Sequence, residues 1–150
     1  MLGRLHEFDN ETIGTLGEGL FYERYLNWAV EMGIIHGDQN GDLMPYAFLT
    51  REQMFVIVYR YINAFDLWWY FRYSHGSPML TSDMVRGISP WAGYAIIRLY
   101  DINLVSSANP PVGGPLRPQD VTARADALRT LIRIGVAIYE NIHPFRFLDD

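Results

Sequence analysis

Three glycines recur at a regular four-residue step, at Gly33, Gly37 and Gly41, and Pro45 follows at the same step. Glycine adopts backbone conformations that other residues avoid, so this run suits a chain that turns sharply and leaves its backbone open to a partner. The residues from Gly33 to Leu49 are therefore expected to form a wound loop.

A helix is predicted on each side of this loop, over about residues 21–32 and about residues 50–64. The second begins at the tetrad Thr50-Arg51-Glu52-Gln53, which has the residue types of a capping box. In such a box the threonine hydroxyl accepts from the Gln53 N–H, and the glutamine amide reaches back to the Thr50 N–H. The apolar residues that follow fit one helical face: Met54, Phe55, Val58 and Ile62.

This pattern resembles the S-layer homology (SLH) domain, whose repeat joins an aromatic position, a glycine loop and a Thr-Arg-Ala-Glu helix start. The corresponding parts are Phe21-Tyr22, Gly33-Ile34-Ile35-His36-Gly37, Asn40-Gly41-Asp42-Leu43-Met44-Pro45 and Thr50-Arg51-Glu52-Gln53. Their spacings match the family without a gap. Leu43 replaces the usual Phe and Gln53 the usual Glu, and both keep the physical role of an apolar plug and a capping side chain.

A second, diverged copy of the pattern follows, and the resemblance covers about residues 21–60 and 89–133. Asn103 stands where Gly33 stood, and asparagine tolerates the left-handed backbone that glycine adopts freely. The other equivalences are Trp91-Ala92, Leu116, Pro118 and the tetrad Ala123-Arg124-Ala125-Asp126. Alanine cannot cap a helix, so Thr122, one position earlier, is expected to take over.

The resemblance implies an all-α fold of tandem helix–loop–helix repeats. The family presents three repeats as a three-sided prism with grooves between them; two are visible here, which implies a partial prism. One domain is expected over residues 1–150, with repeats at about 21–64 and 89–140. The implied function is non-catalytic: anchoring at the cell wall or S-layer, outside the cell, by binding secondary cell-wall polysaccharide that carries a pyruvate ketal.

The candidate ligand-binding residues are Arg51, Arg124, Gly37, Gly41, Thr50 and Trp91. A guanidinium beside the N–H groups that open a helix can grip the carboxylate of a sugar, and the resemblance implies that the motif arginine takes part in this chemistry. For both arginines, an intramolecular salt bridge from loop to helix is the competing interpretation. Trp91 either stacks on a sugar ring or packs inside the protein.

The aromatic segment Phe65–Tyr73, FDLWWYFRY, is expected to continue the preceding helix into the core. It also supports a second functional hypothesis, in which a diverged SLH fold has lost the glycan and self-assembles into oligomers or filaments through aromatic surfaces. Two measurements separate these hypotheses: a glycan-binding assay and the oligomeric state in solution.

Composition excludes several other classes of protein. The net charge of −5 argues against a nucleic-acid partner, and no apolar run approaches the length of a membrane span. The chain has no Cys, and its four histidines lack metal-ligand spacing. The acidic loop beginning at Asp38 lacks the glycine and the final carboxylate of a calcium loop. No catalytic motif is present, so neither an enzyme nor a cofactor is expected.

Overall fold

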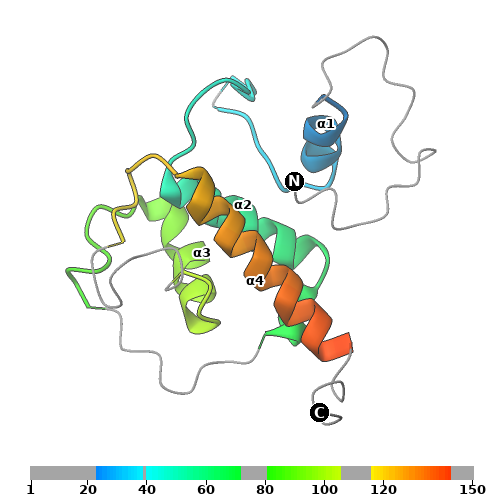
Figure 1. The fold of residues 1–150 in the computed structure, drawn as a ribbon. Helices are drawn as coiled ribbons and strands as arrows, with labels where there is room; N and C mark the ends of the chain where they lie inside the picture. The colour runs from blue at the N-terminus through cyan, green and yellow to red at the C-terminus, as the bar shows by residue number, and fades with distance from the viewer. Residues whose placement is uncertain (1–22, 39, 72–80, 106–115, 143–150) are drawn as a thin grey trace, which may run out of the picture. The chain divides into compact units, whose positions relative to one another are not determined.

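The computed structural model describes residues 23–38, 40–71, 81–105 and 116–142, and this part of the chain is helical (Figure 1). The elements are α1 (Glu23–Glu31), α2 (Arg51–Ala64), the 3-10 helix η2 (Leu67–Tyr70), α3 (Pro90–Asp101) and α4 (Arg124–Ile142). The described residues form no strand, only an isolated antiparallel bridge between Thr50 and Val121. The all-α prediction is confirmed. The chain divides into two compact units, Met1–Ala47 and Phe48–Asp150.

In the first unit, α1 ends in a left-handed turn at Gly33, whose φ is +67°. The Ile34 N–H donates to the Ala29 carbonyl at 2.8 Å, and the Gly33 N–H donates to the Val30 carbonyl at 2.9 Å. These bonds satisfy carbonyls that the last turn of a helix otherwise leaves unpaired. Ile34 and Ala29 are both buried. The predicted helix over 21–32 is therefore confirmed within the described residues, while positions 21 and 22 lie outside them.

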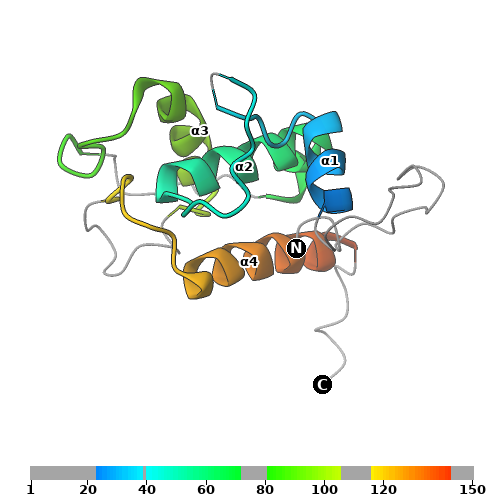
Figure 2. The ribbon, with the colours of Figure 1, turned by 90° about the horizontal axis from the view of Figure 1, so that it is seen from above.

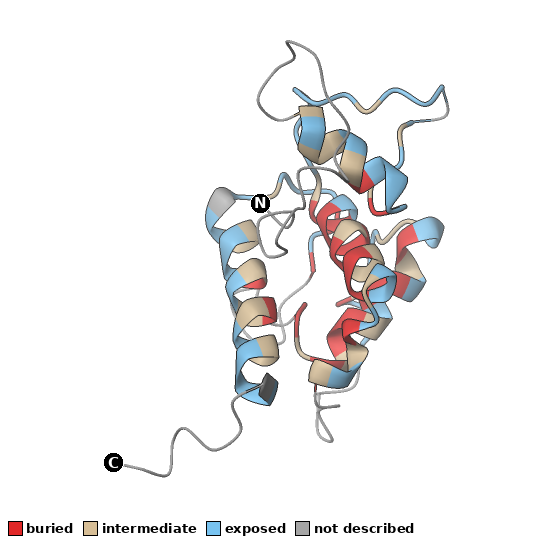
Figure 3. Ribbon diagram, turned by 90° about the vertical axis from the view of Figure 1, so that its right-hand side faces the viewer, coloured by how far each residue is buried: buried red, intermediate tan, exposed pale blue. Residues whose placement is uncertain are grey.

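In the second unit, α2 begins at the capping box that the sequence predicted. The Thr50 hydroxyl accepts from the Gln53 N–H at 3.3 Å, and the Gln53 Oε1 accepts from the Thr50 N–H at 2.9 Å. The predicted apolar face is buried, and Tyr61 and Val56 extend it (Figure 3). Burial of Tyr61 raises the pKa of its phenol to about 12. This helix supplies much of the core of its unit.

The expected continuation of α2 through Phe65–Tyr73 is wrong. The helix ends at Ala64 because Asp66 adopts a left-handed backbone, with φ of +49°, and a single turn of 3-10 helix follows. In that turn Leu67 is buried, whereas Trp69 is 84% exposed. The aromatic run is thus divided between core and surface, and its last two residues lie outside the described part.

Helix α3 packs against α2 (Figure 2) and contributes the other large share of the core. Its buried residues are Ala92, Ala95, Ile96, Leu99 and Tyr100. It ends as α1 does: Asn103 has φ of +63°, and the Leu104 N–H donates to the Leu99 carbonyl at 2.9 Å. Asparagine therefore takes the conformation predicted for it at the position equivalent to Gly33.

A second local correspondence joins the two aligned segments. Met44 before Pro45 and Arg117 before Pro118 both have positive φ, at +44° and +46°. Each opens a turn in which an N–H three residues later donates back to its carbonyl, at 2.9 Å and 3.1 Å respectively. The two segments therefore share the turn that ends the first helix and the turn at the proline, although the loop sequences between these turns differ.

Helix α4 completes the second unit and contacts η2. Thr130 and Ile134 are buried, and the Asn141 amide donates to the Tyr70 carbonyl at 2.9 Å. Thr130 satisfies its own hydroxyl by donating to the Asp126 carbonyl one turn earlier, at 3.0 Å. The N-terminal end of α4 lies beside the start of α2, as the side-chain contacts described below establish.

Candidate functional site

The glycine loop of the first unit is closed by its own carboxylate, Asp38. The Asp38 Oδ1 accepts from the N–H groups of Asn40 and Asp42 at 2.8 and 2.9 Å, and the Asp38 N–H donates to the Asp42 carbonyl at 2.9 Å. These bonds from the Asp42 and Asn40 backbone favour the charged carboxylate and lower the pKa of Asp38. Sequence reasoning missed this role, although an Asp two residues before an Asn in a glycine loop is a common turn signal.

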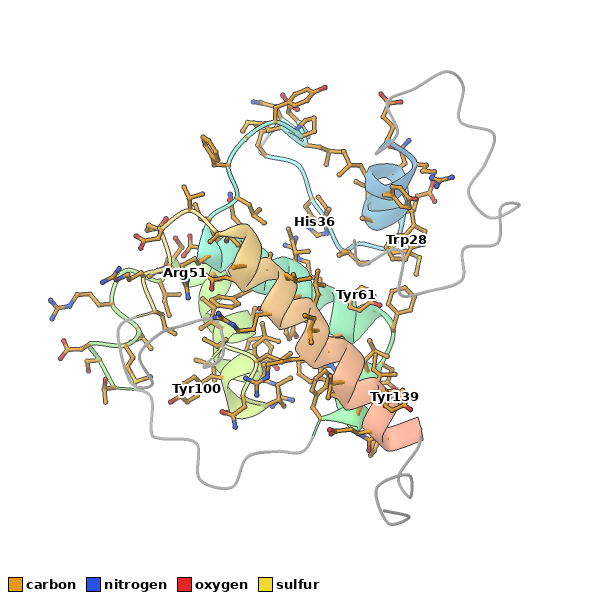
Figure 4. The ribbon with its side chains drawn as sticks, viewed as in Figure 1. Trp28, His36, Arg51, Tyr61, Tyr100 and Tyr139 are labelled. Carbon is orange, nitrogen blue, oxygen red and sulfur yellow. The ribbon has the colours of Figure 1, made fainter. Side chains whose placement is uncertain are left out.

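Neither Gly37 nor Gly41 can carry a side chain without cost, for two different reasons. A Cβ placed on Gly37 would lie 2.3 to 2.8 Å from the backbone atoms of Gly41. Gly41 itself has φ of +84°, which strains any other residue. His36, in the same loop, is exposed (Figure 4). Among the described residues, no group of three potential ligands could hold a metal ion.

Arg51 lies inside a network where the starts of α2 and α4 meet (Figure 4). Its Nε donates to the Leu116 carbonyl at 3.0 Å, and its Nη1 donates to the Asp126 Oδ2 at 3.1 Å. Its side chain is only 8% exposed, and the guanidinium lies 6.0 Å from the centre of the Phe55 ring. The intramolecular salt bridge, one of the two interpretations of Arg51, is therefore present.

The backbone N–H groups that open α2 are also used within the chain. The Arg51 N–H donates to the Asp120 carbonyl at 2.9 Å, and the Glu52 N–H donates to the Pro118 carbonyl at 3.0 Å. The Thr122 N–H returns a bond to the Leu49 carbonyl at 2.8 Å. The premise that these first N–H groups stay free for an anion is wrong, because the loop before α4 occupies them.

Glu52 caps the neighbouring helix, a role that the sequence did not reveal. It is 3% exposed, and its two carboxylate oxygens accept from the Ser89 hydroxyl at 2.8 Å and the Ser89 N–H at 3.0 Å. Ser89 is the N-cap of α3, so this negative charge sits at the positive end of the helix dipole. The cap comes from a residue 37 positions away, which no local pattern encodes.

The start of α4 lacks the side-chain cap that was expected of Thr122. The Thr122 hydroxyl is buried and finds no hydrogen-bond partner in the described part of the chain. Backbone bonds from the N–H groups of Asp126 and Ala127 to the Ala123 carbonyl support the first turn. The expectation that Thr122 replaces the missing cap is therefore wrong. Arg124 is the first residue of α4, and its side chain lies outside the described part.

Trp91 stands in the first turn of α3, and its side chain is more exposed than buried, at 56%. Internal packing accordingly covers less than half of it. The contacts Arg51–Asp126 and Glu52–Ser89 bring the starts of three helices to one end of the second unit. Each helix start carries partial positive charge, which the Asp120 and Pro118 carbonyls meet at α2 and the Glu52 carboxylate meets at α3.

Comparison with known families identifies the glycine loop and the helix start that follows it. Residues 19–55 match the S-layer homology domain. The match includes the whole loop and ends inside α2, so the resemblance predicted from the sequence is confirmed for this segment. It does not extend to residues 89–140. No curated protein and no solved structure gave a significant match to the chain.

SLH domains are non-catalytic modules that attach proteins to cell-wall polysaccharide at the cell surface. None of the helices in the described ranges is both long and apolar enough to cross a membrane. The family match thus supports a surface-anchoring role without specifying the glycan.

Proposed function

We propose that this protein is a non-catalytic anchoring module that binds an anionic, pyruvylated secondary cell-wall polysaccharide at the cell wall or S-layer. The observation that carries the proposal is the SLH match over residues 19–55. The tight loop between Gly37 and Gly41 supports it, because the matched glycines are used as glycines and not as replaceable spacers.

The proposal includes residues 89–140 as a second, diverged SLH repeat and the whole as a partial prism. The support is geometric. Asn103 and Arg117 adopt the left-handed backbone of Gly33 and Met44, at aligned positions and with the same turn hydrogen bonds. Three of these four positions are not glycine, and two aligned pairs of positive φ favour a shared origin over coincidence, because non-glycine residues rarely adopt this conformation.

Within the second unit, we assign the glycan carboxylate to the end where α2, α3 and α4 begin. Trp91 offers an exposed ring for stacking on a sugar, and Arg124 supplies a cation in the first turn of α4. Thr50 and Arg51 fix the shape of this end through the capping box and the bonds to the loop before α4. Gly37 and Gly41 belong to the first unit, and we propose that their loop contacts the glycan separately.

The test is calorimetric titration with wall polymer in its pyruvylated form and after removal of pyruvate. Wild-type protein should bind the pyruvylated polymer, and most of the binding heat should disappear with the polymer that lacks pyruvate. Trp91→Ala and Arg124→Gln should each weaken binding by about tenfold, the loss expected for a stacking or charge-assisted contact. Trp69→Ala is the matched control, because that ring is also exposed but lies beyond the C-terminal end of α2, whereas the proposed site lies at its N-terminal end.

Arg51→Lys should also weaken binding, and its unfolding curve must be measured alongside. Lysine retains the charge but cannot make both of the bonds that the Arg51 fork makes to Leu116 and Asp126. If wild type does not bind under conditions where another SLH domain binds, the glycan-binding proposal is wrong. Binding that ignores Trp91 and Arg124 keeps the function and moves the site.

The second functional hypothesis, self-assembly without glycan, is favoured by one observation: Trp69 is 84% exposed within the aromatic segment. If this surface drives assembly, Trp69→Ala should shift wild-type oligomers toward monomer in sedimentation velocity. An unchanged distribution argues against assembly through Phe65–Tyr73.

A further inference from the structure

The outward side of α4 is apolar along most of its length. Four of its exposed residues are large and apolar, at 43–54% exposure: Leu128, Ile132, Val136 and Tyr139. Their spacing of four, four and three residues places them on one stripe of the helix. Thr130 and Ile134, on the opposite side, are buried, so α4 has a buried side as well as this exposed apolar stripe (Figure 3). A helix of this kind is ordinarily covered on both sides.

Gly135 lies in the interior of α4 beside this stripe, between Ile132 and Tyr139. Glycine weakens a helix relative to alanine, and such a position usually has a packing reason. Here a Cβ on Gly135 would meet nothing within 4 Å, so no contact in the described part of the chain requires the glycine. A position without a side chain lets a second helix approach closely, because the distance between packed helices depends on the residues at their contact.

The charges beside the stripe favour a second copy of α4 as the helix that covers it. Arg129 and Arg133 lie on one flank in the first half of the helix, and Glu140 follows on the same flank near the end. In an antiparallel pair of identical helices, each flank meets the same flank of the other copy in reverse order. With the crossing near Gly135, Glu140 of each copy lies opposite Arg129 of the other.

The antiparallel arrangement also opposes the two helix dipoles favourably. Arg129 already bonds to Asp126 at 3.3 Å, so Glu140 would join an existing charged cluster. Arg133, near the crossing, approaches its own counterpart, and this like-charge contact opposes part of the gain. A parallel pair would instead place the charged flank against the flank of Leu131 and Ile138, where no opposite charge is available.

From this self-complementary pattern we propose that the outward face of α4 is a docking surface for a second copy of this chain, with the two α4 helices antiparallel and crossing at Gly135. The contact is isologous: each copy presents the same stripe, and the residues near Gly135 meet their own counterparts. This surface is distinct from Phe65–Tyr73 and from the proposed glycan site.

The first test is sedimentation velocity of the full chain over a wide concentration range. Wild type should dimerise, and Ile132→Asp should weaken the dimer at least about tenfold, because a charge would be buried at its centre. Ile97→Asp on α3 is the matched control, since Ile97 is 47% exposed and its stripe is not proposed to pair. Gly135→Leu should weaken the dimer by filling the crossing, while circular dichroism confirms that the monomer stays folded.

The second test determines orientation and exploits the absence of Cys from the chain. Leu128→Cys and Tyr139→Cys are made as separate single variants. In the antiparallel pair, a mixture of the two should form a disulfide on oxidation, whereas neither should link efficiently to itself. Salt should weaken the dimer modestly, and Glu140→Arg should weaken it further.

Three results would overturn the proposal: a monomer at every concentration, a dimer unchanged by Ile132→Asp, or efficient linking of Leu128→Cys to itself. A monomer means that α4 is covered within its own chain, and self-linking indicates a parallel pair. None of these results bears on glycan binding, which is measured separately.

Discussion

The starts of α2 and α4 follow similar tetrads, Thr50-Arg51-Glu52-Gln53 and Ala123-Arg124-Ala125-Asp126, yet they are built differently. At α2 the threonine and glutamine of the tetrad cap their own helix. At α4 the first position is Ala123, and the fourth, Asp126, turns instead to Arg51 at 3.1 Å. The start of α2 has its own side-chain cap, while Asp126 at the start of α4 binds an arginine of α2.

This difference shows what the tetrad does in this protein. The side chains of Arg51 and Glu52 contribute little to their own helix. Arg51 binds Leu116 in the loop before α4 and Asp126 in the first turn of α4, and Glu52 caps α3 through Ser89. The tetrad therefore joins three helix starts. An arginine in the first turn is unfavourable with the helix dipole, and the carboxylate of Asp126 together with the Leu116 carbonyl offsets that cost.

The largest expected effect comes from removing Arg51. Arg51→Ala leaves the Leu116 carbonyl and Asp126 without their main partner inside a mostly buried site, and we expect a loss of about 2–4 kcal/mol in the free energy of unfolding. This loss is somewhat smaller than that for a fully buried pair, because Asp126 is 18% exposed and keeps Arg129 as a partner. Denaturant unfolding monitored by tryptophan fluorescence measures it.

The matched comparison is Arg86→Ala, which removes an ion pair with Asp83 whose side chains are both more than 80% exposed. That change should have almost no effect on unfolding, because exposed pairs contribute little. Equal stability of the Arg51 and Arg86 variants would mean that the tetrad does not join the helix starts.

A smaller effect separates the two caps. Thr50→Ala should lower stability by about 1 kcal/mol, the usual cost of losing a threonine N-cap. Thr122→Val should be neutral or slightly stabilising, because it replaces a buried hydroxyl that has no partner among the described residues. Thermal unfolding of the two variants checks both. Equal losses at the two sites would show that Thr122 supports α4 after all.

The features that the sequence predicted correctly are local ones. The capping box, the left-handed Asn103 and the buried face of α2 each depend on residues within one or two turns. Arg51 with Asp126 spans 75 positions, and nothing local distinguishes that bond from a ligand contact. The aromatic run after α2 misled for a different, local reason: its composition fits a buried helix, but Asp66 within it adopts a left-handed conformation and redirects the chain.

The smallest expected effect is the loss of the Asp38 hydrogen bonds in acid, which should affect the glycine loop and not the capped start of α2. Hydrogen bonds from the backbone of Asp42 and Asn40 lower the pKa of Asp38 below its ordinary 3.8. The stabilisation is therefore fully present above about pH 3.8 and is lost as the pH falls through the lowered pKa of the folded loop. Chemical shifts of the Asn40 and Asp42 amide protons should follow this titration in NMR spectra, while the capped amide of Gln53 at α2 should not. Asp38→Asn should abolish the dependence, because its amide does not titrate. Amide shifts of Asn40 that stay constant through acid would mean that the Asp38 carboxylate does not close the loop.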